Sequence, residues 1–372
     1  MIKKIGLLNF HYSNNNYGAV LQAAALNKAI EMLGYQVETI DFIPEVTVQP
    51  KSVRNMVGDI LRLLGLRAKA PKLKPMENEH VFEDFRLTWL PRSEAKYCNL
   101  SDLNTISTEY STVIVGSDQV WRPAMTQEFA LAYFLSFVPE SCKRVSYAAS
   151  FGIDYWQEKN IRTSTANVVK EVQKFHAVSV REDSGVGICK NVFDVNAEHV
   201  LDPTLLVGRE FFEETIKHSP VSDHPADIVY YKLDVNHKFL SQLKQIEEQL
   251  DYRSEDIYYS QVDGKYFFTP VTQWLVKLRD SKLIISDSFH CICFAILFEK
   301  EFIYYPNAER GMSRLESLLK SIGLEHRICR DQNLLNNSAE TYLTKKIDYM
   351  LVNRILEDSR HTSFTFLKNA IS

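Results

Sequence analysis

The chain has 372 residues, which at roughly 100–200 residues per domain suggests two domains or one large α/β unit. Hydrophobic residues make up 45% of the chain and charged residues 24%, which excludes a disordered or fibrous protein. Lysine and arginine number 43 against 47 aspartates and glutamates, and the net charge of −4 gives no reason to expect a nucleic-acid partner.

The N-terminal stretch predicts a strand, a loop, a helix and a second strand. The apolar pattern places the strand at 2–9, the helix at about 19–33 and the second strand at 37–42. Such a unit begins a parallel sheet, and open α/β sheets bind ligands at the carboxyl edge of their strands. The loop that holds Asn16, Tyr17 and Gly18 is therefore a candidate binding site by its position alone.

The remaining pattern alternates strands and helices and predicts an α/β fold of two Rossmann-like halves with a central crevice. In the first half we expect strands at 112–115, 145–149 and 177–180, and helices at 78–90 and 160–175. In the second half we expect strands at 228–232, 256–259, 283–286 and 302–305, and helices at 238–249, 272–279, 289–298 and 314–322. We divide the chain into an N-terminal domain at 1–205 and a C-terminal domain at 206–340. A last helical segment within 341–372, predicted to start near 341, should pack back onto the first domain.

A basic segment at 51–74 differs from the rest of the chain. It carries seven lysines and arginines against one aspartate, an excess of +6 that leaves −10 for all other residues. Its apolar residues recur at helical spacing, which is typical of an amphipathic helix at an anionic membrane surface and equally typical of an ordinary surface helix. The scattered cysteines, the lack of a signal peptide and the lack of a long apolar run predict a cytoplasmic protein, with 51–74 as a peripheral contact to the inner face of the membrane.

Several predicted strands run directly into an unusual polar cluster. In chain order the clusters are Asn16-Tyr17-Gly18, Gly116-Ser117-Asp118-Gln119-Val120-Trp121, Ser150-Phe151-Gly152, Arg181-Glu182, Asp202-Pro203-Thr204 and Ser286-Asp287-Ser288-Phe289-His290, followed by Arg314. In this order and spacing, the set resembles the polysaccharide pyruvyl transferase family over nearly the whole chain. The resemblance implies a fold like that of the two-domain GT-B glycosyltransferases. It also implies transfer of a pyruvyl group from phosphoenolpyruvate to sugar hydroxyls, giving a cyclic ketal in exopolysaccharide or capsule biosynthesis.

The chemistry of such a transfer directs attention to His290. Protonation of the methylene carbon of phosphoenolpyruvate makes a cationic centre that a sugar hydroxyl attacks; phosphate leaves and a second hydroxyl closes the ring. A group that exchanges a proton near neutral pH suits these steps. His290 follows a predicted buried strand, and Asp287 three residues earlier is expected to orient its ring; a helix cap with an interior histidine is the plainer interpretation. Asp118 is the candidate base toward the attacking hydroxyl.

Phosphoenolpyruvate carries a phosphate and a carboxylate, so its site needs at least two cationic or N–H-rich subsites. The predicted donor-binding residues are Arg181, Ser288, Arg310 and Arg314, and the predicted acceptor-binding residues are Asn16, Tyr17, Gly18 and Trp121. Ser288 and Cys291 depart from the family pattern, in which arginine and glycine are usual. Asp202 precedes a proline and is interpreted as part of a turn.

Two other functions remain open from the sequence: a GT-B glycosyltransferase that uses a nucleotide sugar, and a non-catalytic relative that binds glycans. No glycine-rich nucleotide motif and no His/Cys ligand spacing occurs, so we predict neither a metal nor a cofactor, with phosphoenolpyruvate as donor substrate. The expected partners are phosphoenolpyruvate and a glycan acceptor, either free or attached to a lipid carrier.

Overall fold

The computed structural model describes most of the chain. The described residues are 4–45, 75–106, 110–161, 163–221, 224–232, 234–307, 312–331, 335 and 344–372. The basic segment 51–74 and Arg310, both singled out from the sequence, lie outside the described residues.

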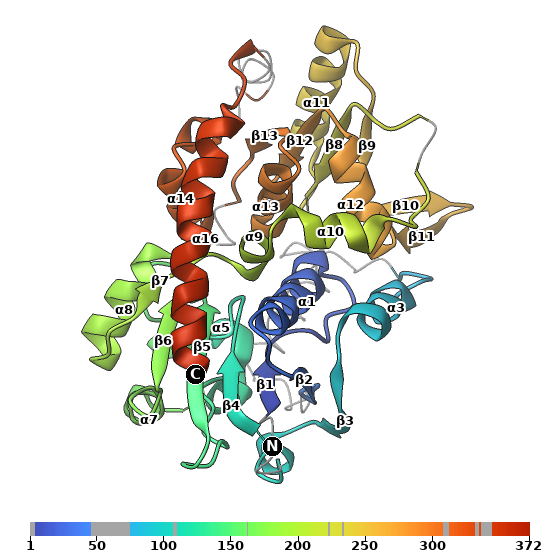
Figure 1. Ribbon diagram of the computed structural model, residues 1–372. Coiled ribbons are helices and arrows are strands. Elements are labelled where there is room, and N and C mark those ends of the chain that lie inside the picture. Colours follow the sequence, from blue (N-terminus) through green and yellow to red (C-terminus); the bar gives the residue numbers. More distant parts are fainter. Residues whose placement is uncertain are drawn as a thin grey trace, which may run out of the picture.

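A seven-stranded sheet forms the core of the first half (Figure 1). Its strand order is β3-β2-β1-β4-β5-β6-β7, and every neighbouring pair is parallel. The strands are β1 (Lys4–Leu8), β2 (Val37–Phe42), β3 (Arg92–Tyr97), β4 (Tyr110–Val115), β5 (Lys143–Ala149), β6 (Ala177–Val180) and β7 (Glu198–His199). The order reverses direction at β1, and the loops after β1 and β4 lie beside each other at the carboxyl edge. This is the position at which α/β sheets bind ligands.

The helices of the first half connect these strands. They are α1 (Tyr17–Met32), α3 (His80–Trp89), α4 (Leu100–Leu103), α5 (Pro123–Thr126), α6 (Ala130–Tyr133), α7 (Thr165–Val172) and α8 (Asp183–Phe193), with short 3₁₀ turns at 127–129 and 158–160. Asn16 caps α1 by accepting a hydrogen bond from the Ala19 amide, and Gly34 ends it with a φ of +84°. Because α1 is buried on nearly all sides and contacts α9 and α13 as well as β2 and α3, it lies between the two halves.

The second half contains a four-stranded parallel sheet in the order β13-β12-β8-β9. Its strands are β8 (Ile228–Tyr231), β9 (Ser254–Asp256), β12 (Leu283–Ser286) and β13 (Glu301–Tyr304), and an antiparallel hairpin pairs β10 (Tyr259–Val262) with β11 (Lys265–Phe268). Its helices are α9 (Pro203–Val207), α10 (Arg209–Ile216), α11 (His237–Leu250), α12 (Val271–Asp280), α13 (Phe289–Leu297) and α14 (Ser313–Ser321), with a 3₁₀ turn at 325–327. The apolar run of α13 is buried along its whole length.

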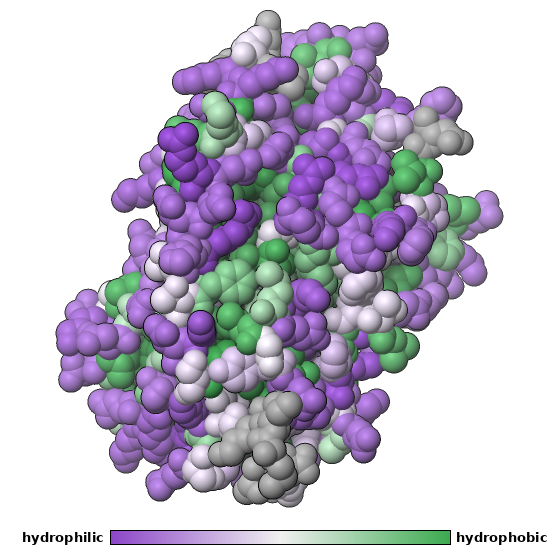
Figure 2. All heavy atoms as spheres, viewed as in Figure 1, coloured by the Kyte–Doolittle hydropathy of each residue, from purple (hydrophilic) through white to green (hydrophobic). Residues whose placement is uncertain are grey.

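The last helix, α16 (Tyr349–Ile371), extends from the second half, where it packs on α9, back to the first half, where it packs on β5 (Figure 1). It begins at Tyr349 rather than near 341. The hydroxyl of Ser363 in α16 accepts a hydrogen bond from the Leu201 amide. This bond holds the helix against the segment that joins the two halves. Figure 2 shows a largely hydrophilic face, with hydrophobic residues gathered where the two halves meet. Among the described residues no helix is long and apolar enough to cross a membrane.

Among the elements that the sequence analysis did not predict, helices α8 and α10 bury apolar residues such as Phe193 and Phe212, whereas β3 and the hairpin of β10 and β11 lie at the periphery. β3 is an edge strand whose side chains are exposed or half-buried, so it lacks the apolar alternation that identifies a strand. The hairpin of β10 and β11 is also mostly exposed. α7 is confined to 165–172, shorter than the predicted helix at 160–175, because Ser164 caps it and the preceding residues form a 3₁₀ turn.

Candidate functional site

Residues from both halves meet at His290, the second residue of α13. The imidazole is buried, with Nε2 at 3.3 Å from Arg181 Nη1 and at 3.5 Å from Asp202 Oδ2. Arg181 directly follows β6, and Asp202 lies three residues after β7. The carboxyl edge of the first sheet and the first turn after β12 therefore meet, as predicted for the candidate site by the position of its motifs.

Gly18, at the start of α1, makes room for this histidine. A Cβ atom on Gly18 would lie only 2.1 Å from His290 Nδ1 and 2.5 Å from its Cγ. We expected Gly18 to admit the backbone to a ligand; in the structure, the close approach that requires glycine is made to the imidazole itself.

Arg181 is held between two carboxylates. Its Nη1 donates to Asp202 Oδ2 at 2.7 Å and its Nη2 donates to Asp118 Oδ1 at 2.9 Å, with the guanidinium fully buried. Burial alone would lower the pKa of Arg181, but the two carboxylates raise it above its usual value. The Nε of Arg181 is buried and has no hydrogen-bond partner among the described residues, so this atom could donate to an anion.

The same contacts keep Asp118 and Asp202 ionised. Burial would raise the pKa of Asp118, yet the charges of Arg181, His290 and Arg314 outweigh it and lower the pKa below its usual value. The pKa of Asp202 is lowered further, against burial, by His290 and Arg181. A carboxylate that binds its proton this weakly is a poor acceptor for a hydroxyl proton. The geometry therefore favours a positioning role for Asp118, as a partner of Arg181. It does not favour the predicted role of Asp118 as a base.

Asp202 forms the turn that the sequence predicted and also has contacts that the sequence did not predict. Its Oδ1 caps α9 by accepting from the amide and the hydroxyl of Thr204, which is the expected turn, while its Oδ2 faces Ser117, Arg181 and His290. One carboxylate thus serves both the turn and the charged cluster. The signal available in the sequence was its place shortly after a strand, the same signal that identified Arg181.

Glu182 was also missed, because an Arg-Glu-Asp run is typical of a solvated ion pair. Its carboxyl is fully buried, and Oε1 accepts hydrogen bonds from Ser150 Oγ, the Phe151 amide and the Gly152 amide at 2.7–3.1 Å. Oε2 has no hydrogen-bond partner among the described residues. Burial raises the pKa of Glu182 even though Arg181 and Arg314 oppose it. Of the three carboxyls beside Arg181, only this one is shifted toward the protonated form.

Arg314, in the first turn of α14, reaches the same cluster. Its Nη1 lies 3.8 Å from Asp118 Oδ1. The ring of Phe289 lies near both arginines: its centre is 5.8 Å from the guanidinium of Arg314 and 4.3 Å from the guanidinium of Arg181. Burial and the nearby charge of Arg181 lower the pKa of Arg314 to about 10, so it stays cationic near neutral pH. At 3.8 Å, the contact of Arg314 with Asp118 is longer than the 2.9 Å contact that Arg181 makes with the same carboxylate.

Asp287 does not orient His290 as predicted. Its Oδ2 accepts from Lys232 Nζ at 3.1 Å, and the carboxylate beside His290 Nε2 is Asp202. Ser288 caps α13 by accepting from the Cys291 amide at 3.4 Å. Cys291 is buried in the core, where burial raises the pKa of its thiol to about 12, so the departure from glycine at this position leaves His290 in place.

Of the predicted acceptor residues other than Gly18, one is exposed and two lie in the core. Trp121 has no exposed surface, stacks on Phe134 and donates its indole N–H to the Tyr133 carbonyl, so it offers no face to a sugar and the stacking prediction is wrong. Tyr17 is equally buried: its hydroxyl donates to the Thr269 carbonyl at 2.6 Å and so joins the two halves. Asn16 is exposed, and its role toward an acceptor stays a prediction.

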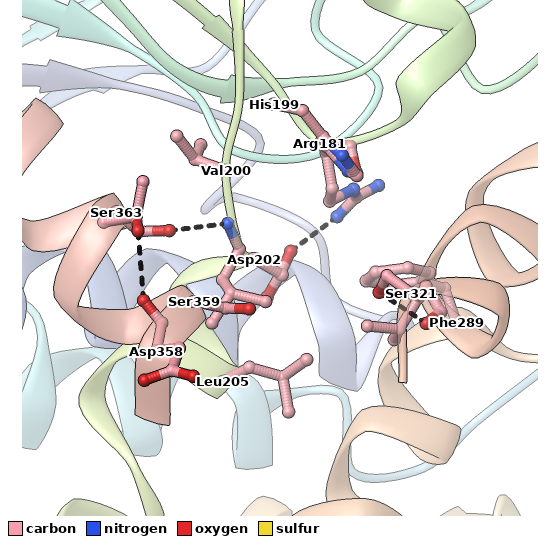
Figure 3. Close-up of a pocket in the computed structure, with 13 residues that line it drawn as sticks. Arg181, His199, Val200, Asp202, Leu205, Phe289, Ser321, Asp358, Ser359 and Ser363 are labelled. Atoms are coloured by element: carbon pink, nitrogen blue, oxygen red, sulfur yellow. Dashed lines mark hydrogen bonds and ion pairs between the residues drawn. The ribbon is translucent and has the colours of Figure 1, made fainter. Parts of the chain in front are cut away.

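A cavity of about 240 Å³ borders the cluster on the side of α16 (Figure 3). Arg181, Asp202 and Phe289 line it together with Ser359 and Ser363 of α16. The cavity reaches the Arg181–Asp202 ion pair, whereas Asp118 does not line it. Among the described residues no cluster of histidine, cysteine or acidic side chains has the arrangement of a metal site.

Comparison with known proteins adds a family and a fold. The sequence model of the polysaccharide pyruvyl transferase family matches residues 16–309. No curated protein was found to match the chain. Similar solved structures include UDP-GlcNAc 2-epimerase from Neisseria meningitidis bound to UDP-GlcNAc, with 11% identity and a TM-score of 0.50 over 96% of this chain and 98% of that one. Another is UDP-GlcNAc 2-epimerase from Methanocaldococcus jannaschii with UDP-GlcNAc and UDP, with 13% identity and a TM-score of 0.48 over 95% of this chain and 98% of that one. A mutant O-GlcNAc transferase from Thermobaculum terrenum has 11% identity and a TM-score of 0.46 over 99% of this chain and 66% of that one. At such identities the similarity concerns the fold alone. The similarity to the Neisseria structure at a TM-score of 0.50, together with the two parallel sheets, confirms the predicted GT-B-like architecture of two α/β halves.

Proposed function

We propose that this chain, which belongs to the polysaccharide pyruvyl transferase family, transfers a pyruvyl group from phosphoenolpyruvate to two hydroxyls of a sugar and forms a cyclic ketal. The observation that supports this function best is the meeting of His290 from the second half with Arg181 and Asp202 from the first in a buried cluster. The cluster combines a group able to exchange a proton with cations able to hold an anionic donor, and the reaction needs both.

In this proposal, His290 exchanges the proton at the methylene carbon of the donor. Asp202 faces the imidazole at Nε2, while Arg181 keeps Asp202 and Asp118 in position. Arg314 faces the donor with its guanidinium, and Arg181 contributes its Nε. Attack by the first hydroxyl forms a C–O bond at C2, and this hydroxyl loses its proton. Phosphate then leaves as the bond between C2 and the phosphate oxygen breaks. The second hydroxyl closes the ring by forming a second C–O bond at C2, with loss of its proton.

The acceptor in this proposal is a glycan that enters from the exposed loop around Asn16. We also propose that the basic segment 51–74 holds the protein at a membrane surface, where a lipid-linked acceptor would be found. The residues of this segment lie outside the described part of the chain. Binding to anionic vesicles at low salt, and release at high salt, would support this contact. An absence of binding at low salt would contradict it.

The test of the function is to incubate the protein with phosphoenolpyruvate and a panel of sugars and glycans. We expect one acceptor to gain the mass of one pyruvyl unit as phosphate is released. We expect His290→Gln to reduce the rate by about 10²–10⁴, the usual contribution of a general acid–base group. His361→Gln, at an exposed position on α16, serves as the matched control and should leave the rate unchanged. A His290→Gln rate within about threefold of the unchanged protein would contradict the assignment, and stabilisation by nucleotide sugars but not by phosphoenolpyruvate would favour a glycosyltransferase.

A further inference from the structure

Three residues that follow neighbouring strands of the second sheet form a separate charged cluster. β8, β12 and β13 are adjacent and parallel, and Ser286 lies in register with both Tyr231 and Tyr304. The next residue of each strand, namely Lys232, Asp287 or Tyr305, therefore lies at the same carboxyl edge of the sheet. This edge leads directly into Ser288 and His290.

Lys232 is the centre of this cluster. Its Nζ donates to Asp287 Oδ2 at 3.1 Å and lies 4.5 Å from the ring centre of Tyr305 and 5.3 Å from that of Phe239. Only 4% of the lysine side chain and 1% of the aspartate side chain are exposed. An ammonium group has three N–H donors, and among the described residues one carboxylate oxygen accepts from it.

A buried ammonium group with unused donors is costly, because it has left water without replacing all of its hydrogen bonds. The aromatic rings compensate for part of the lost hydration through cation–π attraction. An anionic oxygen bound beside Asp287 would satisfy the remaining donors.

We infer that Lys232 is the subsite for the phosphate group of the donor, and this inference rests on the proposed function. The donor has two anionic groups. In the cluster around Arg181, that guanidinium already pairs with Asp118 and Asp202, whereas Arg314 lies at 3.8 Å from Asp118. The planar guanidinium of Arg314 suits a carboxylate, which it can bind with two parallel hydrogen bonds, whereas the compact ammonium of Lys232 suits phosphate as a point charge. Asp287, the partner of Lys232, lies three residues before His290, so the phosphate subsite and the proton-exchanging residue are close along the chain.

The experiment measures binding of three probes by titration calorimetry: phosphoenolpyruvate, inorganic phosphate and pyruvate. In Lys232→Met we expect the affinity for phosphoenolpyruvate and for phosphate to fall at least about tenfold, the usual loss of a charge-assisted hydrogen bond, with pyruvate affinity nearly unchanged. Lys282→Met is the matched control. Lys282 also pairs with an aspartate (Asp227, 2.8 Å) and lies 4.6 Å from a tyrosine ring centre, but it is 59% exposed at the opposite end of β12.

Lys232→Met leaves a buried carboxylate without its cation, so the double variant Lys232→Met/Asp287→Asn, which removes both charges, is measured in parallel. The inference would be overturned if either folded variant bound phosphate as tightly as the unchanged protein. It would also be overturned if a variant lost as much affinity for pyruvate as for phosphate. Binding of phosphate that depends on Lys232 without any pyruvyl transfer would support the anion subsite and refute the proposed function. Pyruvyl transfer unaffected by both variants would leave the function standing and refute the subsite.

Discussion

The contact between Gly18 and His290 leads to a prediction in which stability and activity change together. In Gly18→Ala the new Cβ would stand 2.1 Å from Nδ1 and 2.9 Å from Cβ of His290, well inside the distance at which carbon and nitrogen atoms can coexist. The neighbour is a buried ring that already contacts Arg181 and Asp202, so the imidazole has to move by about 1 Å or the helix has to shift.

Two opposing effects set the magnitude. Alanine favours a helix over glycine by about 0.5–1 kcal/mol, whereas overpacking a close-packed site costs about 1–3 kcal/mol. We therefore expect a net loss of about 1 kcal/mol in the free energy of unfolding. Activity should fall far more, by about 10²-fold, because displacing a catalytic group by about 1 Å has an effect of this order.

Gly187→Ala is the matched control, because Gly187 lies within α8 and a Cβ there would meet no atom within 4 Å. This variant should gain about 0.5–1 kcal/mol in stability and keep its activity. Denaturant unfolding and phosphate release from phosphoenolpyruvate in the presence of acceptor measure the two quantities. If Gly18→Ala were as stable and as active as Gly187→Ala, the argument that glycine is required to admit His290 would be refuted.

Two further predictions concern the buried carboxyls. Glu182 has a raised pKa, so the folded protein keeps this proton while the unfolded chain releases it above about pH 4.5, and folding loses stability as pH rises. Glu182→Gln should therefore gain stability relative to the unchanged protein as pH increases from 4 to 8; a difference in denaturant unfolding that is constant with pH would contradict this. Asp202→Asn removes the charge that faces Arg181 and His290 and should cost about 3–5 kcal/mol. Asp194→Asn, in an exposed pair with Lys190, should be nearly neutral, and equal losses for the two variants would argue against the buried pairing.

The sequence by itself determined the succession of strands and helices and the edge at which the site forms. Alternating apolar strands and amphipathic helices report local periodicity, which a single sequence carries in full. Because strands in such a sheet run parallel, every residue that directly follows a strand lies at one edge. This argument was sufficient to place Asp118 and Arg181 at the carboxyl edge of the first sheet and His290 at the carboxyl edge of the second.

Only the tertiary structure decided which of these side chains contact one another. Asp287 is near His290 in sequence but pairs with Lys232, because β8 is the neighbour of β12 in the sheet. Asp202 reaches His290 because the second half folds against the first. Trp121 follows a strand like the site residues, yet its ring is covered by core aromatics. Strand order, the contact between halves and the facing of a side chain all depend on contacts between residues far apart in the chain. Local pattern therefore predicts the edge of the sheet, and long-range packing selects the pairs within it.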